Sequence, residues 1–123
     1  MHLILGGRYM GKRIYAEKLY GKFENVCNFE FDEIKVPGLI INLHFGIKNL
    51  ILNGSNALEY FNDRIEILKH CVIIGDEISG GVIPVDKLER LWRDETGKIY
   101  QYLANEADIV DRIFAGLAIR LKG

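Results

Sequence analysis

The amino-acid sequence predicts an α/β fold of three layers, in which a mostly parallel sheet is flanked by helices. Short apolar runs with few polar breaks recur along the chain, which is typical of strands buried on both faces of such a sheet. Segments with helical apolar spacing lie between those runs. Glycines follow several of the runs, where the chain is expected to turn out of a strand.

The size and charge of the chain limit what it can be. A length of 123 residues fits one domain, and we expect residues 1–123 to form it. Hydrophobic residues make up 49% and charged residues 27%, which is the composition of a folded protein with a core. The formal net charge is −1 and no basic run stands out, so we expect neither nucleic acid nor a membrane surface as a partner.

The sequence shows no motif of paired cysteines, no signal peptide and no membrane span. Cys27 and Cys71 form no C-x-x-C pair, and both lie in apolar stretches, so we expect small buried core residues. Residues 1–20 lack the charged start and apolar middle of a signal peptide, and no apolar run reaches the length of a membrane span. These features predict a cytoplasmic protein.

The first half of the chain begins with an apolar strand, residues 2–5, that ends at a glycine pair. A helix is expected next, with an apolar face made by Tyr15, Ala16, Leu19, Tyr20 and Phe23. Residues 25–29 are a possible second strand, and residues 30–37 a connecting loop. Residues 39–43 predict a third strand, with His44 at its end.

The second half continues the alternation. Ser55 is expected to cap a helix with a core face of Leu58, Phe61, Ile65 and Leu68, and residues 71–74 predict the next buried strand. After a glycine-rich loop at 79–84, Asp86 starts a long helical pattern that includes Leu88, Leu91, Trp92, Ile99, Tyr102 and Leu103. Residues 109–115 predict the last strand. Strands that alternate with helices imply crossover connections between parallel strands.

The turn after the first strand has the spacing of a phosphate-binding loop. Residues 6–13 read "GGRYMGKR", which matches G-x-x-x-x-G-K up to its last position. Glycines let backbone N–H groups converge on one anion, and the following helix adds its own unpaired N–H groups. We therefore predict a nucleoside-triphosphate site, for GTP or ATP, with the phosphates held by Gly6, Gly7, Arg8, Gly11, Lys12 and Arg13. In the alternative interpretation this is a plain glycine turn whose Lys12 and Arg13 face water.

Arg13 stands where such loops carry the Ser or Thr whose hydroxyl binds Mg²⁺. A guanidinium repels a cation but donates readily to phosphate oxygens. The substitution therefore predicts that anion binding is retained, while Mg²⁺-assisted phosphoryl transfer is weakened.

Acidic residues follow the strand at 71–74. Ligands of parallel sheets bind beyond the carboxyl ends of the strands, so Asp76 and Glu77 are candidate metal ligands, and Glu77 is also a candidate catalytic base. They could equally cap the following turn. His44 is expected at the same edge, either as a buried histidine bonded to backbone or as a covalent guanylyl acceptor.

Several ordered segments resemble the adenosylcobinamide kinase/adenosylcobinamide-phosphate guanylyltransferase family of cobalamin biosynthesis. The segments are "GGRYMGKR" with the following Ala16-Glu17, then "EISGGVIP" at 77–84, "RLWRDETG" at 90–97, "QYLANEADIV" at 101–110 and "AGLAIRLK" at 115–122. The resemblance implies a P-loop fold, a nucleotide as cosubstrate, a cobinamide-type small molecule as second substrate, and a homo-oligomer. It places Glu77 at a motif position of the family.

The chain also departs from the family pattern. The family's metal-linked acid falls near Asn42, and its loop ends in Gly-Lys-Ser where this chain has Arg13. Its guanylyl-carrying histidine, in an H-R-x-x-R-P-like helix, has no counterpart between Phe29 and Leu39. Three hypotheses follow: a kinase acting on a cobinamide-like alcohol, a homologue that binds nucleotide or corrinoid without turnover, and an unrelated phosphate-loop kinase. Guanylyl transfer is the activity that the residues favour least.

Overall fold

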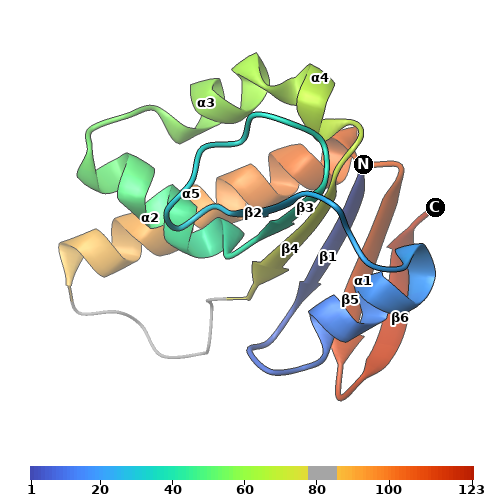
Figure 1. The fold of residues 1–123 in the computed structure, drawn as a ribbon. Coiled ribbons are helices and arrows are strands. Elements are labelled where there is room, and N and C mark those ends of the chain that lie inside the picture. The colour runs from blue at the N-terminus through green and yellow to red at the C-terminus, as the bar shows by residue number, and fades with distance from the viewer. Residues whose placement is uncertain (78–85) are drawn as a thin grey trace.

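The computed structural model describes residues 1–77 and 86–123, and it confirms the α/β fold class. The elements are β1 (His2–Gly6), α1 (Lys12–Tyr20), β2 (Val26–Asn28), β3 (Leu39–Ile41), α2 (Leu43–Leu52), α3 (Ala57–Asp63), α4 (Ile65–Leu68), β4 (Val72–Asp76), α5 (Lys87–Glu106), β5 (Ile109–Phe114) and β6 (Leu117–Lys122). They form one six-stranded sheet in the order β2-β3-β4-β1-β5-β6, with helices on both faces (Figure 1).

Strand β1 lies inside the sheet and pairs in parallel with β4 on one side and β5 on the other. Its last residue, Gly6, is level with Asp76 of β4 and Ile113 of β5. A Cβ atom at Gly6 would lie 2.5 Å from the Ile113 carbonyl oxygen, so only glycine fits where the chain leaves the sheet. This register places the loop after β1 and the side chain of Asp76 at the same edge.

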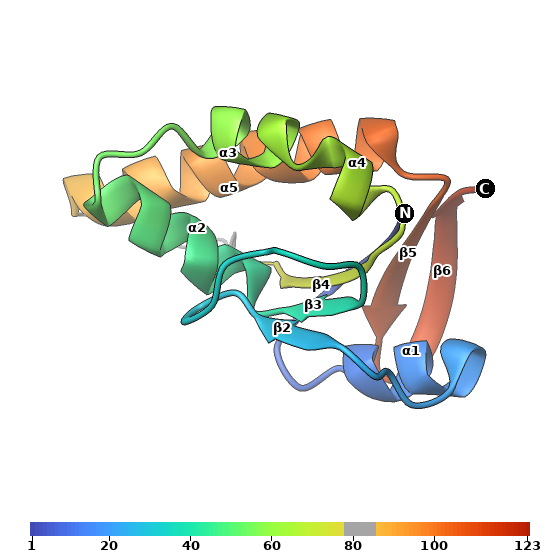
Figure 2. The ribbon, with the colours of Figure 1, turned by 45° about the horizontal axis from the view of Figure 1, so that its top comes forward.

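The two faces of the sheet are covered unequally (Figure 2). Helix α1 lies alone on one face, whereas α2, α3, α4 and α5 cover the other. Neighbouring side chains of β1 alternate accordingly, because Ile4 packs in the cluster with Ala16 of α1 and Leu3 packs in the larger cluster with Phe61 of α3. The phosphate-loop helix therefore depends on few apolar contacts.

A buried polar network fastens α1 to the sheet. Asp111 of β5 is 1% exposed and accepts hydrogen bonds from the Tyr15 hydroxyl at 2.8 Å and from the Arg120 Nε at 2.5 Å. His2 Nε2 lies 2.6 Å from the same carboxylate, and its Nδ1 lies 2.6 Å from the Tyr20 hydroxyl. The network thus joins β1, β5, β6 and α1 through one carboxylate.

Four sequence-based expectations need correction. Residues 43–44 belong to α2, not to the third strand, because Asn42 adopts a left-handed conformation (φ 57°) that ends β3. The helix expected over 55–68 is two helices, α3 and α4, and Asn56 rather than Ser55 caps the first. The antiparallel edge strand β6 was not predicted. Its sequence holds the short apolar stretch 117–119, but all six of its residues are exposed, so it is an edge strand and not one of the buried strands that the pattern identifies.

Several side chains expected in the core lie at the surface instead. Helix α1 ends at Tyr20, so Phe23 is outside it, and Ala16 is the apolar residue of its expected face that is fully buried. Leu19, Leu58 and Leu91 are about half exposed, at 51%, 47% and 46%. Cys71 is buried as expected, but Cys27 is only partly so. Since several helices pack through one narrow stripe, apolar residues beside that stripe remain in solvent.

The glycine-rich segment 79–84, which the sequence predicts to be a loop, lies outside the described residues. The predicted long helix after Asp86 is confirmed as α5, and the Asp86 carboxylate caps it by accepting from the Leu88 N–H. None of the helices in the described part of the chain has the length and apolarity that crossing a bilayer requires.

Asp111→Asn tests the network. Burial raises the pKa of this carboxyl, but hydrogen bonds from Arg120, Tyr15 and His2 outweigh that effect and hold the pKa below its ordinary value. A lowered folded-state pKa contributes stability above the unfolded pKa of about 3.9, and this stability is lost as pH falls through the folded pKa. We expect Asp111→Asn to lower the unfolding free energy by about 2 kcal/mol at pH 7.

Urea unfolding at pH 7 and at pH 3 checks this, with Asp63→Asn on the exposed end of α3 as the matched control. The deficit of Asp111→Asn should shrink at the lower pH. Equal stability of the variant and the native protein at pH 7 would contradict the role given to the network.

Candidate phosphate-binding site

The loop between β1 and α1 has the geometry of an anion cradle. Tyr9 (φ 62°) and Gly11 (φ 92°) both lie in the left-handed region, and the Met10 N–H donates to the Gly7 carbonyl at 3.3 Å. Gly11 is the N-cap of α1 and has no side chain to occupy the first N–H groups of the helix. Those donors and the positive end of the helix dipole face the loop.

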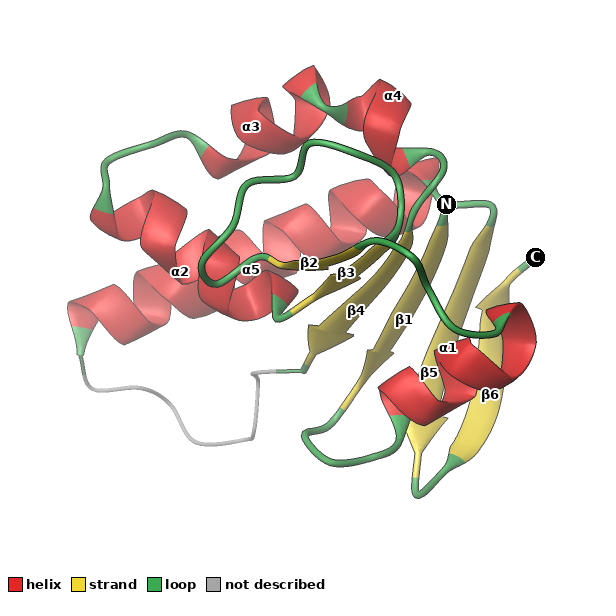
Figure 3. Cartoon of the chain, viewed as in Figure 1, coloured by secondary structure: helices red, strands yellow, loops and turns green. Residues whose placement is uncertain are grey.

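The turn of the β5–β6 hairpin supports this loop from the side (Figure 3). The Gly116 N–H donates to the Met10 carbonyl at 3.0 Å, and the Ala115 N–H donates to the Met10 sulfur at 3.3 Å. On the other side, the Glu77 N–H donates to the Gly6 carbonyl at 2.9 Å. The turn that leads into the unpredicted strand β6 is thus part of what holds the loop in place.

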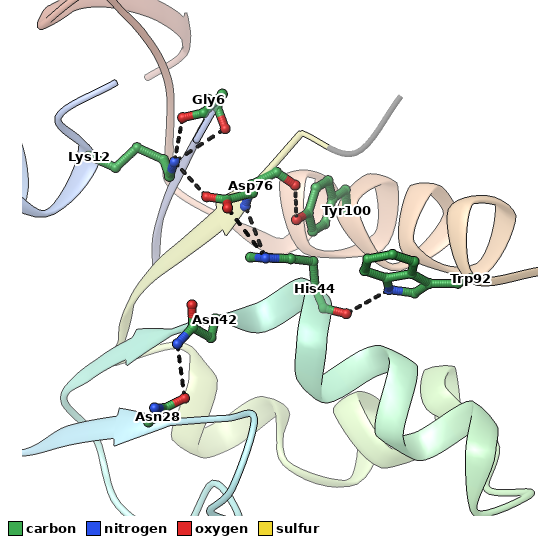
Figure 4. Close-up of polar contacts among 9 residues, drawn as sticks. Gly6, Lys12, Asn28, Asn42, His44, Asp76, Trp92 and Tyr100 are labelled. Carbon is green, nitrogen blue, oxygen red and sulfur yellow. Dashed lines mark hydrogen bonds and ion pairs between the residues drawn. The ribbon is translucent and has the colours of Figure 1, made fainter. Parts of the chain in front are cut away.

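Lys12 turns inward. Its side chain is 7% exposed, and Nζ lies 2.6 Å from Asp76 Oδ1, 2.8 Å from the Gly7 carbonyl and 3.3 Å from the Gly6 carbonyl (Figure 4). An ammonium group has three N–H donors, so these contacts can engage all of them. The alternative in which Lys12 faces water is therefore wrong.

The two arginines of the loop lie outside this contact. Arg13 is half exposed and pairs with Glu17 on the next turn of α1, with Nε 3.2 Å from Oε1. Arg8 is exposed and stacks over the Tyr9 ring at 5.1 Å. Arg13, unlike Arg8, also lines the cavity beside the loop.

Asp76 and His44 meet beside Lys12 (Figure 4). His44 Nε2 lies 3.3 Å from Asp76 Oδ2, and His44 Nδ1 accepts the backbone N–H of Asp76 at 3.2 Å. Burial lowers the pKa of His44, Asp76 counteracts this, and the charges of Lys12 and Arg8 lower it further. His44 is therefore a buried histidine bonded to backbone, as one of the two sequence-based alternatives has it, although it lies on α2.

Two aromatic side chains of α5 complete the surroundings. The Tyr100 hydroxyl donates to the Asp76 carbonyl at 2.6 Å, and burial raises the pKa of that hydroxyl. The Trp92 indole donates to the His44 carbonyl at 2.7 Å. The helical pattern of the sequence includes Trp92, but nothing in the spacing of either residue from Asp76 or His44 reveals these bonds.

The other candidate acid points elsewhere. Glu77 forms a two-point contact with Arg112 of β5, at 2.7 and 3.1 Å. Its role as metal ligand or base remains a prediction.

Asn42 donates through Nδ2 to Asn28 Oδ1 at 3.1 Å. In the described residues no three His, Cys, Asp or Glu side chains gather closely enough to hold a metal ion.

A cavity of about 430 Å³ opens beside the loop. Its lining joins Lys12, Arg13 and Asp76 to the apolar side chains of Ile14, Ile41 and Ile74. The cavity thus combines charged groups from the loop and β4 with apolar side chains from α1, β3 and β4. Such a cavity suits a ligand with an anionic end and a less polar body.

Gly75→Ala tests how closely α5 packs against this edge. A Cβ atom at Gly75 would lie 2.6 Å from the Tyr100 hydroxyl, which must then leave the Asp76 carbonyl. We expect a loss of about 2 kcal/mol in unfolding free energy, measured by urea denaturation. Gly97→Ala on α5, where nothing lies within 4 Å, should instead gain up to about 1 kcal/mol. Equal effects of the two substitutions would contradict the packing.

A parallel sheet that carries a glycine loop, a buried lysine at the start of the next helix and an acid on the neighbouring strand defines a P-loop nucleotide-binding fold. Residues 42–121 match the family described as cobinamide kinase / cobinamide phosphate guanyltransferase. The chain belongs to this family. The match begins at Asn42, so the phosphate loop is evidence independent of it.

A comparison with curated proteins agrees. The chain is 32% identical over 104 residues to the bifunctional adenosylcobalamin biosynthesis protein CobU of Salmonella typhimurium. The alignment covers 71% of this chain and 55% of the relative, so the chain spans about half the length of that protein.

Proposed function

We propose that this protein binds ATP or GTP at the loop 6–13, as a kinase-type member of its family that acts on a cobinamide-like alcohol. The observation that carries the proposal is the inward position of Lys12, next to the free N–H groups of α1 and the carboxylate of Asp76. The phosphates would lie on the loop amides, and Lys12 would neutralise their outer charge. The apolar cavity supports a larger second substrate beside them.

The residues fit only part of a magnesium site. Mg²⁺ in nucleotide sites takes one or two carboxylates together with phosphate oxygens, and Asp76 could supply one. The hydroxyl usually found at position 13 is replaced by a guanidinium, and the side chain at position 42 is an amide bonded to Asn28. A bound cation would neutralise phosphate charge. Arg13, which lines the cavity and pairs with Glu17, would turn from that carboxylate to supply part of this positive charge.

Guanylyl transfer is not part of the proposed activity, because none of the chain's three histidines suits a covalent role. His2 is buried between Asp111 and Tyr20 on the far edge of the sheet. His44 has both ring nitrogens turned to Asp76. His70 is exposed, just before β4, at the edge opposite the loop.

A second candidate function is binding without turnover. The altered positions Arg13 and Asn42 favour it, since both remove cation ligands that phosphoryl transfer depends on.

The homo-oligomer implied by the family resemblance also remains a prediction. Three exposed apolar residues at the β5–β6 edge, Phe114, Leu117 and Ile119, support it, because a second copy of the chain would cover them.

Calorimetry with ATP and GTP, in EDTA and in Mg²⁺, tests the proposal. We expect binding to persist in EDTA, because the loop amides, Lys12 and Arg13 hold the phosphates without a cation. Arg13→Ser should weaken binding in EDTA about threefold and make it respond to Mg²⁺, since a hydroxyl ligand returns. Lys18→Ser, which removes another cation of α1, is the matched control. A strict requirement of the native protein for Mg²⁺ would overturn the expectation.

Incubation with GTP radiolabelled at its α-phosphate tests the exclusion of guanylyl transfer. After denaturation and electrophoresis we expect no label on the protein, because His44, the histidine beside the loop, has both ring nitrogens turned to Asp76. A parallel sample with excess unlabelled GTP corrects for trapped nucleotide. Label that survives denaturation and is removed by acid, as a phosphoramidate is, would restore a covalent mechanism.

A further inference from the structure

Asp76 is fixed at four points by residues from three helices. Its backbone N–H donates to His44 Nδ1 at 3.2 Å, and its carbonyl accepts from the Tyr100 hydroxyl at 2.6 Å. One carboxylate oxygen lies 2.6 Å from Lys12 Nζ, and the other lies 3.3 Å from His44 Nε2. The Asp76 side chain is therefore held in one orientation.

The contacts of His44 determine where its ring carries the proton. A backbone N–H can only donate, so Nδ1, which accepts from Asp76, must hold a lone pair. The ring is then neutral, with its proton on Nε2, the nitrogen that faces Asp76 Oδ2. One nitrogen of the ring thus accepts from the Asp76 backbone, and the other carries its proton on the side of the Asp76 carboxylate.

His44 is itself held firmly. It is 3% exposed and lies in the first turn of α2. Its carbonyl accepts the Trp92 indole N–H at 2.7 Å, and its ring stacks on the Trp92 ring with centroids 6.5 Å apart. A side chain anchored in this way can impose an orientation on a neighbour rather than adapt to it.

We propose that His44 is a positioning residue that keeps the Asp76 carboxylate against Lys12, so that the phosphate-binding lysine is occupied until an anion displaces it. This proposal rests on the proposed function, because it assigns Lys12 to the phosphates. With Gly6, Gly7 and Asp76 engaging its three donors, Lys12 must give up at least one contact to meet a phosphate. The Asp76 carboxylate competes with the incoming phosphate for the Lys12 ammonium and also repels it. His44 holds this carboxylate beside Lys12 and so strengthens the competition.

Binding of inorganic triphosphate in EDTA, measured by calorimetry, tests the competition. His44→Leu and Asp76→Asn should each tighten binding about fivefold, since either change releases Lys12 from the carboxylate. The double variant should match Asp76→Asn alone, because His44 acts through that carboxylate. His44→Gln, which keeps a donor toward Asp76, should stay close to the native protein, and His70→Ala is the control for loss of an exposed histidine.

Additive effects of the two substitutions, or weaker binding by His44→Leu, would overturn the proposal, because a merely structural histidine predicts those results. Nucleotide and triphosphate that both fail to bind the native protein would overturn the proposed function instead. A ligand-free measurement then still decides the role of His44: the ¹⁵N resonance of the Lys12 ammonium should be visible in the native protein and in His70→Ala, and should broaden in His44→Leu. An unchanged signal in His44→Leu contradicts the proposal.

The native protein alone supplies one more readout, which holds even where a variant fails to fold. Nitrogen NMR of the histidine rings should show His44 with its proton on Nε2. A proton on Nδ1 would contradict the contacts from which the positioning role is derived.

Discussion

The parallel pairing of β1 with β4 is the constraint on which the rest of the site depends. It brings Gly6, where the phosphate loop begins, level with Asp76, where β4 ends. Lys12 follows Gly6 across the loop, at the start of α1. Its ammonium points back over the ends of the strands and lies 2.6 Å from the Asp76 carboxylate. A shift of one residue in that register would turn the Asp76 side chain to the other face of the sheet and remove the contact.

The two helical layers divide the work around this contact. Helix α1 presents the loop amides, and it is held to its face of the sheet by a small apolar cluster and by the buried Asp111 network. Helices α2 and α5 belong to the larger core, and from there His44 and Tyr100 reach Asp76. Helix α1 on one face of the sheet thus positions the loop, and helices α2 and α5 on the other face position Asp76.

Membership of the cobinamide kinase / cobinamide phosphate guanyltransferase family fits the fold, while the site residues suggest a narrower chemistry. An amide at position 42, bonded to Asn28, stands where the family resemblance leads one to expect an acid. The carboxylate beside Lys12 comes from the neighbouring strand instead. The proposed function therefore keeps phosphate binding, which rests on Lys12 and the loop amides, and leaves guanylyl transfer out.

The sequence by itself determined the alternation of strands and helices, the phosphate loop and the acid after β4, because apolar spacing, glycines and short motifs act over a few residues. It did not reveal that α2 begins at Leu43, since "LIINL" is as apolar as a buried strand and the left-handed turn at Asn42 leaves no mark on that pattern. The tertiary structure alone decided that His44, Asp76, Trp92 and Tyr100 meet. They are separated by up to 56 residues along the chain, and only the pairing of β4 beside β3 and the packing of α5 on α2 bring them together.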